Sequence, residues 1–204
     1  MCPAVASMPV IMKSMQLFSG AIARAIANLK IVGDSAYPAN VSLAVHALCE
    51  TFRGGNKLMV FGNGGSAADA QHIASELTGR FSFNRKPLPA LALTTDSSFL
   101  TAWSNDCSFD DIFARQVEAH GKPGDVAWGI STSGNSKNVV TGLRKAKELG
   151  LRTIGFTGHG GGAAAAHSDI LLAVPLKVTA EIQEVHQLTY HYICGEVERD
   201  LFSS

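Results

Sequence analysis

The first quarter of the chain has the periodicity of helices rather than of strands. Over residues 12–52 the apolar positions are spaced mostly as on a helix, and a turn is expected around residues 33–38. The apolar positions that fit one helical face are Leu17, Ile22, Ile26 and Leu29. We therefore predict two N-terminal helices, the second of which covers residues 39–52.

Beyond residue 56 the pattern changes to short apolar runs that alternate with helical segments. The expected strands are residues 57–61, 88–93, 125–130, 152–156 and 169–174. The expected helices are residues 67–77, 136–149 and 180–202. Almost wholly apolar strands that alternate with helices are typical of a parallel sheet covered on both faces. We predict an α/β fold, a three-layer, doubly wound sheet of five parallel strands in flavodoxin-like order, with N-terminal helices.

No repeat, low-complexity tract or linker divides this pattern. We expect one domain over residues 1–204, with a helical region at 1–52 and an α/β core with a C-terminal helix at 53–204. In doubly wound sheets, ligands bind beyond the carboxyl ends of the strands. Several loops rich in Gly, Ser or Thr follow an expected strand, so we expect these loops to gather at one edge of the sheet.

The amino-acid composition restricts the class of protein to which the chain can belong and the kinds of partner it is expected to bind. Apolar residues make up 46% of the chain and charged residues 17%, which is typical of a globular protein. Lys and Arg number 17, as do Asp and Glu, so a basic surface for nucleic acid is not expected. The apolar start is broken by Pro3, Pro9 and Lys13, and no apolar run has the length of a membrane span. We expect no signal peptide, no membrane association and no nucleic-acid partner.

The four cysteines are far apart, and none belongs to a CxxC motif: Cys2, Cys49, Cys107 and Cys194. A disulfide framework or a structural zinc site is therefore not expected. A reducing compartment is the simpler interpretation, and we expect a cytoplasmic protein.

A hydroxyl-rich loop, Ser131-Thr132-Ser133-Gly134-Asn135-Ser136, separates an expected strand from an expected helix. Its four hydroxyls and its backbone N–H groups would meet at a helix N-terminus, whose dipole favours an anion. No GxxxxGK[ST] motif is present, which favours a single phosphate ester over a nucleoside triphosphate. Ser and Thr also cap helices and form turns, but four hydroxyls in six residues favour phosphate binding.

A glycine-rich loop at residues 62–67 follows the first expected strand and reads Gly-Asn-Gly-Gly-Ser-Ala. It matches the GxGxxA dinucleotide fingerprint, but the acid expected about twenty residues on is missing, since Asp96 comes later. A tight turn between strand and helix explains the same residues. We favour a loop whose backbone closely approaches a substrate, with polar contacts from Asn63 and Ser66.

Two of the expected helices carry polar groups that could complete a site. His72 and Glu76 share a helical face, so they could bind one metal ion or act as acid or base. An ordinary surface pair has the same spacing. On the last helix, Gln183, Gln187 and His191 lie within roughly 80° of one another, although a solvated face fits that arrangement as well.

Asn105 and Asp106 are expected in the loop after the second strand, downstream of Thr94, Thr95 and Asp96. Turn chemistry explains each of these residues when it is taken alone.

Three segments together resemble a known family. Residues 61–77 read FGNGGSAADAQHIASEL, residues 129–136 read GISTSGNS and residues 181–186 read EIQEVH. They are similar to the phosphoheptose isomerases of the sugar isomerase (SIS) superfamily, and the similarity extends over about residues 40–202. The STSGNS segment alone is typical of the superfamily. The DAQHxxxE segment, combined with IQEVH and a histidine five residues later, is far more specific.

The resemblance implies a function, a cofactor and partners. Members of this family interconvert sedoheptulose 7-phosphate and D-glycero-D-manno-heptose 7-phosphate, the first step towards nucleotide-activated heptose. They are metal-dependent homotetramers with active sites at subunit interfaces, and one zinc ion per subunit is expected. By motif, the metal ligands would be His72, Glu76, Gln183 and His191. The expected substrate-binding residues are Asn63, Gly64, Gly65, Ser66, Glu76, Asn105, Asp106, Ser131, Thr132, Ser133, Ser136 and Gln183.

Aldose–ketose isomerisation proceeds through an enediol and needs a base at carbon and an acid at oxygen. We assign Glu76 as the base and His191 as the acid. Asp69 lies one turn before His72 and is a further catalytic or supporting candidate.

Three other functions remain open. A non-catalytic SIS protein that binds the replication initiator DnaA is similar along the whole chain but departs at the catalytic positions, whereas Glu76 and His191 are present here. A second alternative is another SIS isomerase, acting on arabinose 5-phosphate or a hexose phosphate. The third is a dinucleotide oxidoreductase, which depends on residues 62–67 alone.

Overall fold

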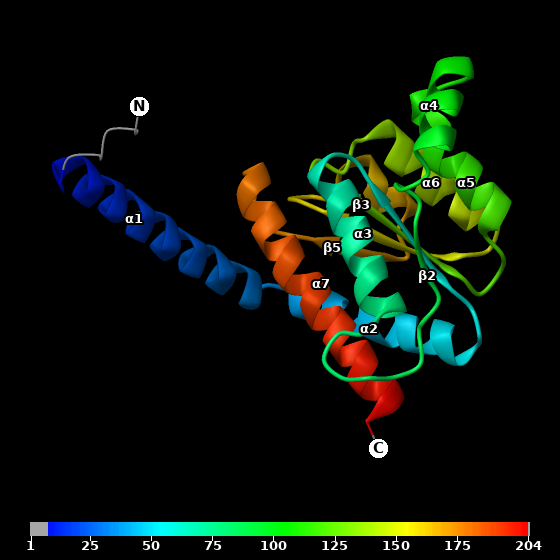
Figure 1. The fold of residues 1–204 in the computed structure, drawn as a ribbon, viewed down its shortest axis with the longest axis horizontal. Coiled ribbons are helices and arrows are strands. Elements are labelled where there is room, and N and C mark those ends of the chain that lie inside the picture. The colour runs from blue at the N-terminus through cyan, green and yellow to red at the C-terminus, as the bar shows by residue number, and fades with distance from the viewer. Residues whose placement is uncertain (1–7, 204) are drawn as a thin grey trace, which may run out of the picture.

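Two helices, α1 (Met8–Gly33) and α2 (Tyr37–Arg53), form the N-terminal region, as predicted. The computed structural model of the chain describes residues 8–203 (Figure 1). The expectations for Cys2 and for the first seven residues therefore lie outside the described residues. Pro38 lies in the first turn of α2, where the N–H group that proline lacks would have no partner within the helix.

Five parallel strands form one sheet in the order β2-β1-β3-β4-β5, which confirms the predicted flavodoxin-like order. The strands are β1 (Leu58–Gly62), β2 (Ala90–Ala92), β3 (Val126–Ser131), β4 (Arg152–Thr157) and β5 (Ile170–Ala173). Leu58 pairs with Val126, and Val126 pairs with Arg152, so the three central strands start in register. Their carboxyl ends lie at one edge, and the glycine-rich and hydroxyl-rich loops leave the sheet there.

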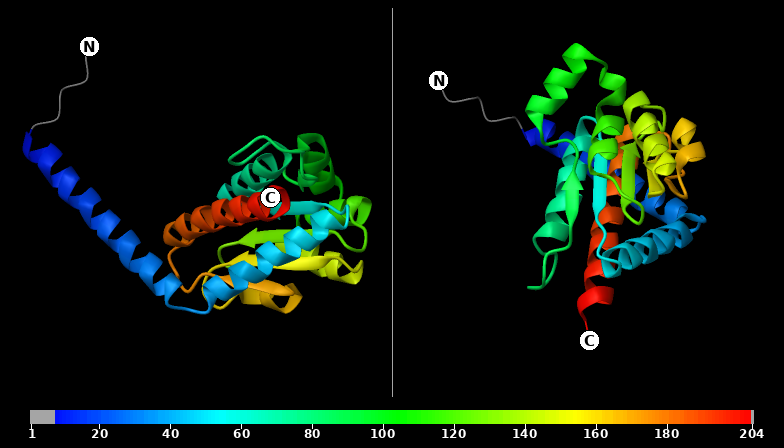
Figure 2. Two further views of the ribbon diagram at one scale, coloured as in Figure 1. Left: turned by 90° about the horizontal axis from the view of Figure 1, so that it is seen from below. Right: turned by 90° about the vertical axis from the view of Figure 1, so that its right-hand side faces the viewer.

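Helices cover both faces of the sheet, which confirms the three-layer arrangement (Figures 1 and 2). The main helices of the α/β core are α3 (Gly65–Thr78), α5 (Ile112–His120), α6 (Lys137–Glu148) and α7 (Thr179–Phe202). Strand residues alternate between the faces, so Leu58 packs in a cluster with α2, α3 and α7, whereas Met59 packs with α5 and α6. Helices α3 and α7 therefore share one face of the sheet.

The segment between β2 and β3 contains more helix than the sequence pattern predicted. Helix α4 (Ser97–Asp106) and a short 3-10 helix, η1 (Phe109–Asp111), precede α5 there. Asn105 and Asp106 are the last two residues of α4, so the expectation of a loop at these positions is wrong. The physical reason is at the other end of α4, where the Asp96 carboxylate accepts a hydrogen bond from the N–H of Phe99 and caps the helix.

Two further boundaries differ from the sequence pattern. Strand β2 is shorter than residues 88–93 and covers only Ala90–Ala92. A second 3-10 helix, η2 (Gly162–His167), follows β4. Within residues 8–203, no helix is both long enough and apolar enough to cross a membrane.

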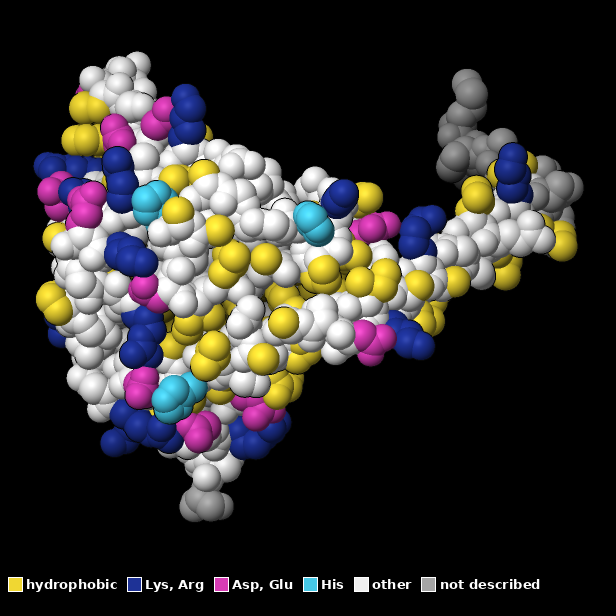
Figure 3. All heavy atoms as spheres, turned by 180° about the vertical axis from the view of Figure 1, so that it is seen from behind, with side chains coloured by type: hydrophobic (Ala, Val, Ile, Leu, Met, Phe, Trp, Pro, Cys, Tyr) yellow, Lys and Arg dark blue, Asp and Glu magenta, His cyan; other side chains and the backbone are white. Residues whose placement is uncertain are grey.

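Helix α1 extends away from the α/β core, with its N-terminal end far from the sheet (Figures 1 and 2). Its predicted apolar face is largely exposed, with 68% of Leu17 and 64% of Ile26 accessible. Hydrophobic side chains are visible along α1 and over the neighbouring surface of the core (Figure 3). The periodicity therefore predicts the helix correctly, but the other described residues do not bury its apolar face.

Candidate active site

Three predicted metal ligands meet where α3 packs against α7. Atom Nε2 of His72 lies 3.0 Å from Oε1 of Glu76 and 3.4 Å from Nε2 of His191. One potential ligand atom from each residue lies within 4.8 Å of the other two. His72 and Glu76 share a face of α3 because they are four residues apart, and His191 faces them from α7. Two nitrogen atoms and a carboxylate oxygen are a donor set that suits zinc.

The fourth predicted ligand, Gln183, lies two turns before His191 on α7. Its amide nitrogen lies near Gly65, because a Cβ atom built on Gly65 would be 3.0 Å from Nε2 of Gln183. Gln183, Gly65 and Asp69 line one hollow of about 370 Å³, together with Gln187. The predicted polar face of α7 is thus turned towards the N-terminal half of α3 rather than entirely towards solvent.

The hydroxyl-rich loop connects β3 to α6 and gathers its side chains at the N-terminus of that helix. Oγ of Ser131 lies 3.0 Å from Oγ of Ser136 and 3.4 Å from Oγ of Ser133. Gly134 has a φ of +68°, and a Cβ atom there would lie 2.1 Å from the carbonyl oxygen of Gly161. A glycine is therefore required at the point where the loop packs against the turn before η2.

A second hollow, of about 280 Å³, adjoins the hydroxyl-rich loop. Its lining includes Thr132 and Ser133 and two side chains that can carry positive charge, His159 and Lys177. The sequence analysis did not single out these two residues, because they lie outside the loop motif. Their proximity could be recognised only from the fold, which brings the end of β4 and the segment before α7 to this loop.

The glycine-rich loop offers less side-chain chemistry than predicted. The Asn63 amide exchanges two hydrogen bonds of 2.8 and 2.9 Å with the Asn138 amide on α6. Ser66 is buried, whereas Gly64 and Gly65 are exposed. The loop thus presents mainly its backbone at the edge of the sheet, where a substrate would bind.

Asn105 and Asp106, two further predicted site residues, are the last residues of α4. The Asn105 amide donates a 2.8 Å hydrogen bond to the Asp106 carboxylate, and both residues are exposed at the end of α4. Asp106 does not belong to the cluster of possible metal ligands found among the described residues.

Tyr190 contributes a buried hydroxyl to the cluster, and the sequence analysis did not consider it. The Tyr190 oxygen lies 3.0 Å from Nδ1 of His72. Burial, followed by the charge of Asp69, raises the pKa of Tyr190 to about 12, so this phenol is protonated at neutral pH. Burial is also the largest reason that the pKa of Asp69 is raised above its ordinary value.

His186 lies in the IQEVH segment but belongs to the core. Its ring lies 3.8 Å from the Phe156 ring, measured between centroids, and its Nε2 atom lies 3.2 Å from the carbonyl oxygen of Thr157. Burial lowers the pKa of His186 to about 4, so the ring is neutral at physiological pH. This histidine therefore supports the packing of α7 on the sheet.

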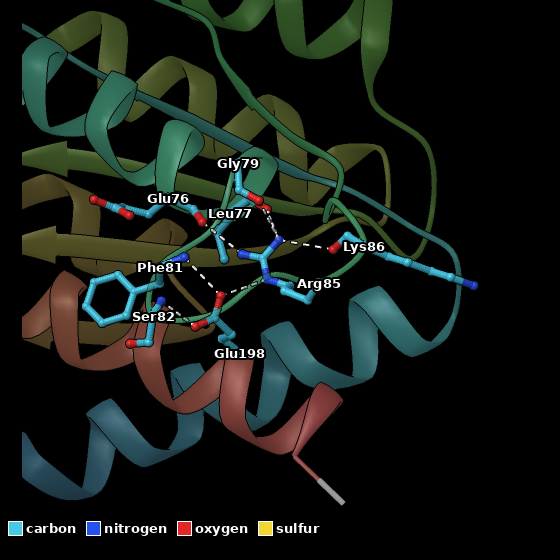
Figure 4. Close-up of polar contacts among 8 residues, drawn as sticks. All are labelled: Glu76, Leu77, Gly79, Phe81, Ser82, Arg85, Lys86 and Glu198. Carbon is cyan, nitrogen blue, oxygen red and sulfur yellow. Dashed lines mark hydrogen bonds and ion pairs between the residues drawn. The ribbon is translucent and has the colours of Figure 1, made fainter.

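A buried ion pair lies further along the same two helices (Figure 4). Nε of Arg85 donates to Oε1 of Glu198 over 3.0 Å, and the Arg85 side chain also donates to the carbonyl oxygens of Glu76, Leu77, Gly79 and Lys86. The Glu198 carboxylate accepts from the N–H groups of Phe81 and Ser82. This arrangement joins the C-terminal end of α3, the following loop and α7.

Comparisons with known proteins agree with one another. Residues 21–158 match the SIS domain family. The phosphoheptose isomerase of Synechocystis sp. is 54% identical over 170 residues, or 83% of this chain and 88% of that protein. The phosphoheptose isomerase of Aquifex aeolicus is 51% identical over 177 residues, or 87% and 93% of the two chains.

Two solved structures share the fold closely. The phosphoheptose isomerase from Francisella tularensis has a TM-score of 0.86 and 36% identity, covering 91% of this chain and 98% of that chain. The phosphoheptose isomerase from Neisseria gonorrhoeae has a TM-score of 0.84 and 40% identity, covering 90% of this chain and 98% of that chain.

Proposed function

Since the chain belongs to the phosphoheptose isomerase family of SIS-domain proteins, we propose that its catalytic centre is the cluster of His72, Glu76 and His191. The chain is an intramolecular aldose–ketose isomerase. It converts sedoheptulose 7-phosphate to D-glycero-D-manno-heptose 7-phosphate, the first step towards nucleotide-activated heptose. The observation that carries the assignment of the centre is the convergence of three ligand atoms, all within 4.8 Å of one another, from α3 and α7.

The reaction moves one proton between adjacent carbon atoms. Glu76 removes a proton from C1 of the ketose, and His191 donates a proton to the carbonyl oxygen on C2, which gives an enediol. His191 then takes the proton from the hydroxyl on C1, and Glu76 returns its proton to C2. The product is the aldose, and no atom is gained or lost. Asp69 is the third candidate, either in proton transfer or in supporting His72.

The donor set of the cluster supports a metal ion, and we propose one zinc ion per subunit held by His72, Glu76, His191 and Gln183. Bound zinc would supply Lewis-acid stabilisation of the negative charge that develops on the substrate oxygen atoms. Glu76 can combine its two roles because a carboxylate has two oxygen atoms. His191 turns one nitrogen towards His72, so it acts at any moment either as a ligand or as a proton carrier.

We propose that the substrate phosphate binds to the hydroxyls of Ser131, Thr132, Ser133 and Ser136 at the N-terminus of α6. The helix dipole favours an anion at this position, and the close spacing of the hydroxyls supports several hydrogen bonds to one phosphate group. The backbone of the glycine-rich loop then lies beside the sugar, with Asn63, Gly64, Gly65 and Ser66 as its contacts. Asn105 and Asp106 are further substrate candidates.

We propose a homotetramer with active sites at subunit interfaces. The supporting feature is the apolar face of α1, which is exposed in one subunit and needs to be covered by another protein surface. A groove of about 370 Å³ between α1, α2 and α7 continues this surface and is lined by Leu29, Tyr37, Leu188 and Tyr192. The described cysteines are unpaired, which agrees with a cytoplasmic site of action.

The decisive test is a Glu76→Gln variant, assayed with sedoheptulose 7-phosphate beside wild type and a Glu118→Gln control. Glu118 lies on α5 and pairs with Arg115 at the surface, so the control makes the same chemical change away from the cluster. Loss of the base should reduce turnover by about 10²–10⁴-fold. If the Glu76→Gln variant stays within about tenfold of wild type, roughly 1.4 kcal/mol of barrier, the assignment of the base is wrong.

A further inference from the structure

The hollow beside the hydroxyl-rich loop combines hydroxyl groups with side chains that can carry positive charge. Thr132 and Ser133 come from the loop between β3 and α6, whereas His159 follows β4 and Lys177 precedes α7. The hollow has a volume of about 280 Å³, and apart from two apolar side chains its lining consists of these four residues. No acidic side chain among residues 8–203 lines it. Hydroxyls, a lysine and a histidine are hydrogen-bond donors that together suit an anion.

Main-chain hydrogen bonds hold the three segments around this hollow together. The N–H group of Gly158 donates a 2.9 Å hydrogen bond to the carbonyl oxygen of Thr132. The N–H group of His159 donates a 3.0 Å hydrogen bond to the carbonyl oxygen of Leu176. Gly158 permits this close approach, because a Cβ atom there would lie 2.6 Å from the carbonyl oxygen of Thr132. The backbone therefore fixes where His159 and Lys177 start relative to the loop, while both residues stay exposed.

A phosphate ester at the hydroxyl-rich loop carries more negative charge than the loop itself offsets. Such a group has a charge of about −1.5 to −2 at neutral pH, whereas a helix N-terminus supplies roughly half a positive charge. Lys137, the cation next to the loop in sequence, lies 3.6 Å from the Asp110 carboxylate and is paired there. Neither Lys177 nor His159 forms an ion pair with any residue of the described range 8–203. These two side chains are therefore available to an anion in the hollow.

We propose that Lys177 and His159 are phosphate-binding residues, which contact the phosphate monoester of the substrate on the side of Thr132 and Ser133. This inference rests on the proposed function, because it takes the hydroxyl-rich loop as the phosphate site. Lys177 supplies a full positive charge on a flexible side chain, and His159 donates a hydrogen bond from a ring nitrogen. Both residues bind a group that does not react. They therefore strengthen substrate binding, which lowers KM, and leave the rate of proton transfer unchanged.

The variant Lys177→Met removes the charge, keeps a flexible side chain and tests this proposal. The matched control is Lys147→Met, which makes the same change near the opposite end of α6, where Lys147 pairs with Asp169 at the surface. The first measurement is steady-state kinetics with sedoheptulose 7-phosphate. KM should rise about tenfold in Lys177→Met, because a hydrogen bond to a charged group is lost, and kcat should stay within about twofold of wild type. The control should match wild type in both parameters.

The second measurement uses inorganic phosphate as the probe, in isothermal titration calorimetry, so that it does not depend on turnover. The dissociation constant should be about tenfold higher in Lys177→Met than in wild type and in the Lys147→Met control. Two further variants identify the chemistry of the contact. Lys177→Arg keeps the positive charge and should stay within about threefold of the wild-type affinity. His159→Leu removes a donor but no full charge, so its loss of affinity should be smaller than that of Lys177→Met.

The outcomes separate this inference from the proposed function. The inference is overturned if Lys177→Met keeps the wild-type KM, or if its KM rises while its affinity for inorganic phosphate equals that of wild type, which would place Lys177 at the sugar. A kcat reduced more than about tenfold in Lys177→Met would also overturn it, because the residue would then act in the chemical step. If wild type has no isomerase activity, the proposed function fails, and the phosphate titration alone decides whether Lys177 binds phosphate.

Discussion

Two groups of ionisable side chains lie along α3 and α7, and the two groups differ in how deeply they are buried. Near the C-terminal end of α3, Arg85 and Glu198 are 2% and 1% exposed, and both make further hydrogen bonds to the backbone. Closer to the middle of α3, His72 and Glu76 are 39% and 21% exposed. There, three ligand atoms converge, and no Arg or Lys within residues 8–203 forms an ion pair with Glu76.

The two groups meet at Glu76. Its carbonyl oxygen accepts a 2.8 Å hydrogen bond from Nη2 of Arg85, while its carboxylate lies against His72. Figure 4 shows the carboxylate pointing away from Arg85. The backbone of the proposed base is therefore held by the buried pair, and its side chain belongs to the cluster of proposed metal ligands.

The buried pair of Arg85 and Glu198 is suited to stabilising the fold, whereas the cluster of His72, Glu76 and His191 is suited to function. A buried charge whose hydrogen bonds are all made contributes to a unique packing, and removing its partner leaves a costly unpaired charge. Ionisable side chains that converge from two helices and stay partly exposed are typical of binding sites. We therefore expect mutations at the first group to lower stability and mutations at the second to lower activity.

The largest effect on stability should come from Glu198→Ala. It leaves Arg85 buried without its carboxylate, so the free energy of unfolding should fall by about 3–5 kcal/mol. The matched control is Glu196→Ala on the same helix, which removes a surface pair with Arg199 and should cost no more than about 1 kcal/mol. Urea unfolding followed by circular dichroism measures both. Equal losses in the two variants would show that the buried pair has no special structural role.

The sequence predicts the two groups unequally, and the reason lies in their spacing. His72 and Glu76 are recognisable because four residues on one helix place them on one face. Arg85 and Glu198 are 113 residues apart, and their neighbourhood depends on how the loop after α3 folds back on α7. Tyr190 is overlooked for another reason, since a tyrosine in an amphipathic helix is usually a core residue.

The fold was predicted more completely than the site. Strand order follows from the alternation of apolar runs and helices, because crossover connections allow few arrangements. The helices between residues 97 and 120 were not predicted, because the Ser, Thr and Asp residues before them favour both turns and helix caps. For α1, periodicity identifies the apolar face but gives no information about the surface that covers it.

Zinc binding should have a smaller effect on the free energy of unfolding, and this effect tests whether the buried pair influences the proposed metal centre. At a free concentration of about 100 times its dissociation constant, zinc should raise the free energy of unfolding of wild type by about 2.7 kcal/mol. The gain should be absent in His191→Ala and preserved in Glu198→Gln, because only the first variant removes a proposed ligand. Thermal unfolding with and without zinc measures it. Loss of the gain in Glu198→Gln would mean that the buried pair also sets the metal geometry.

The smallest expected effect is the pH dependence of the buried pair. Burial alone would raise the pKa of Glu198, but hydrogen bonds from Phe81 and Ser82 and the charge of Arg85 hold it below its ordinary value. The native state therefore binds fewer protons at Glu198 than the unfolded state does. The stability that this group contributes is present above the ordinary glutamate pKa of about 4.3 and is lost as pH falls through the lower native pKa.

The comparison of wild type with Glu198→Gln isolates this contribution from other acid-sensitive groups. Glutamine has no proton to gain, so the stability difference between the two proteins should be largest near neutral pH and should shrink as pH falls below about 4.3. Urea unfolding at a series of pH values measures the difference. A gap that stays constant down to acid pH would mean that the hydrogen bonds of Glu198, rather than its charge, hold the C-terminal end of α3 against α7.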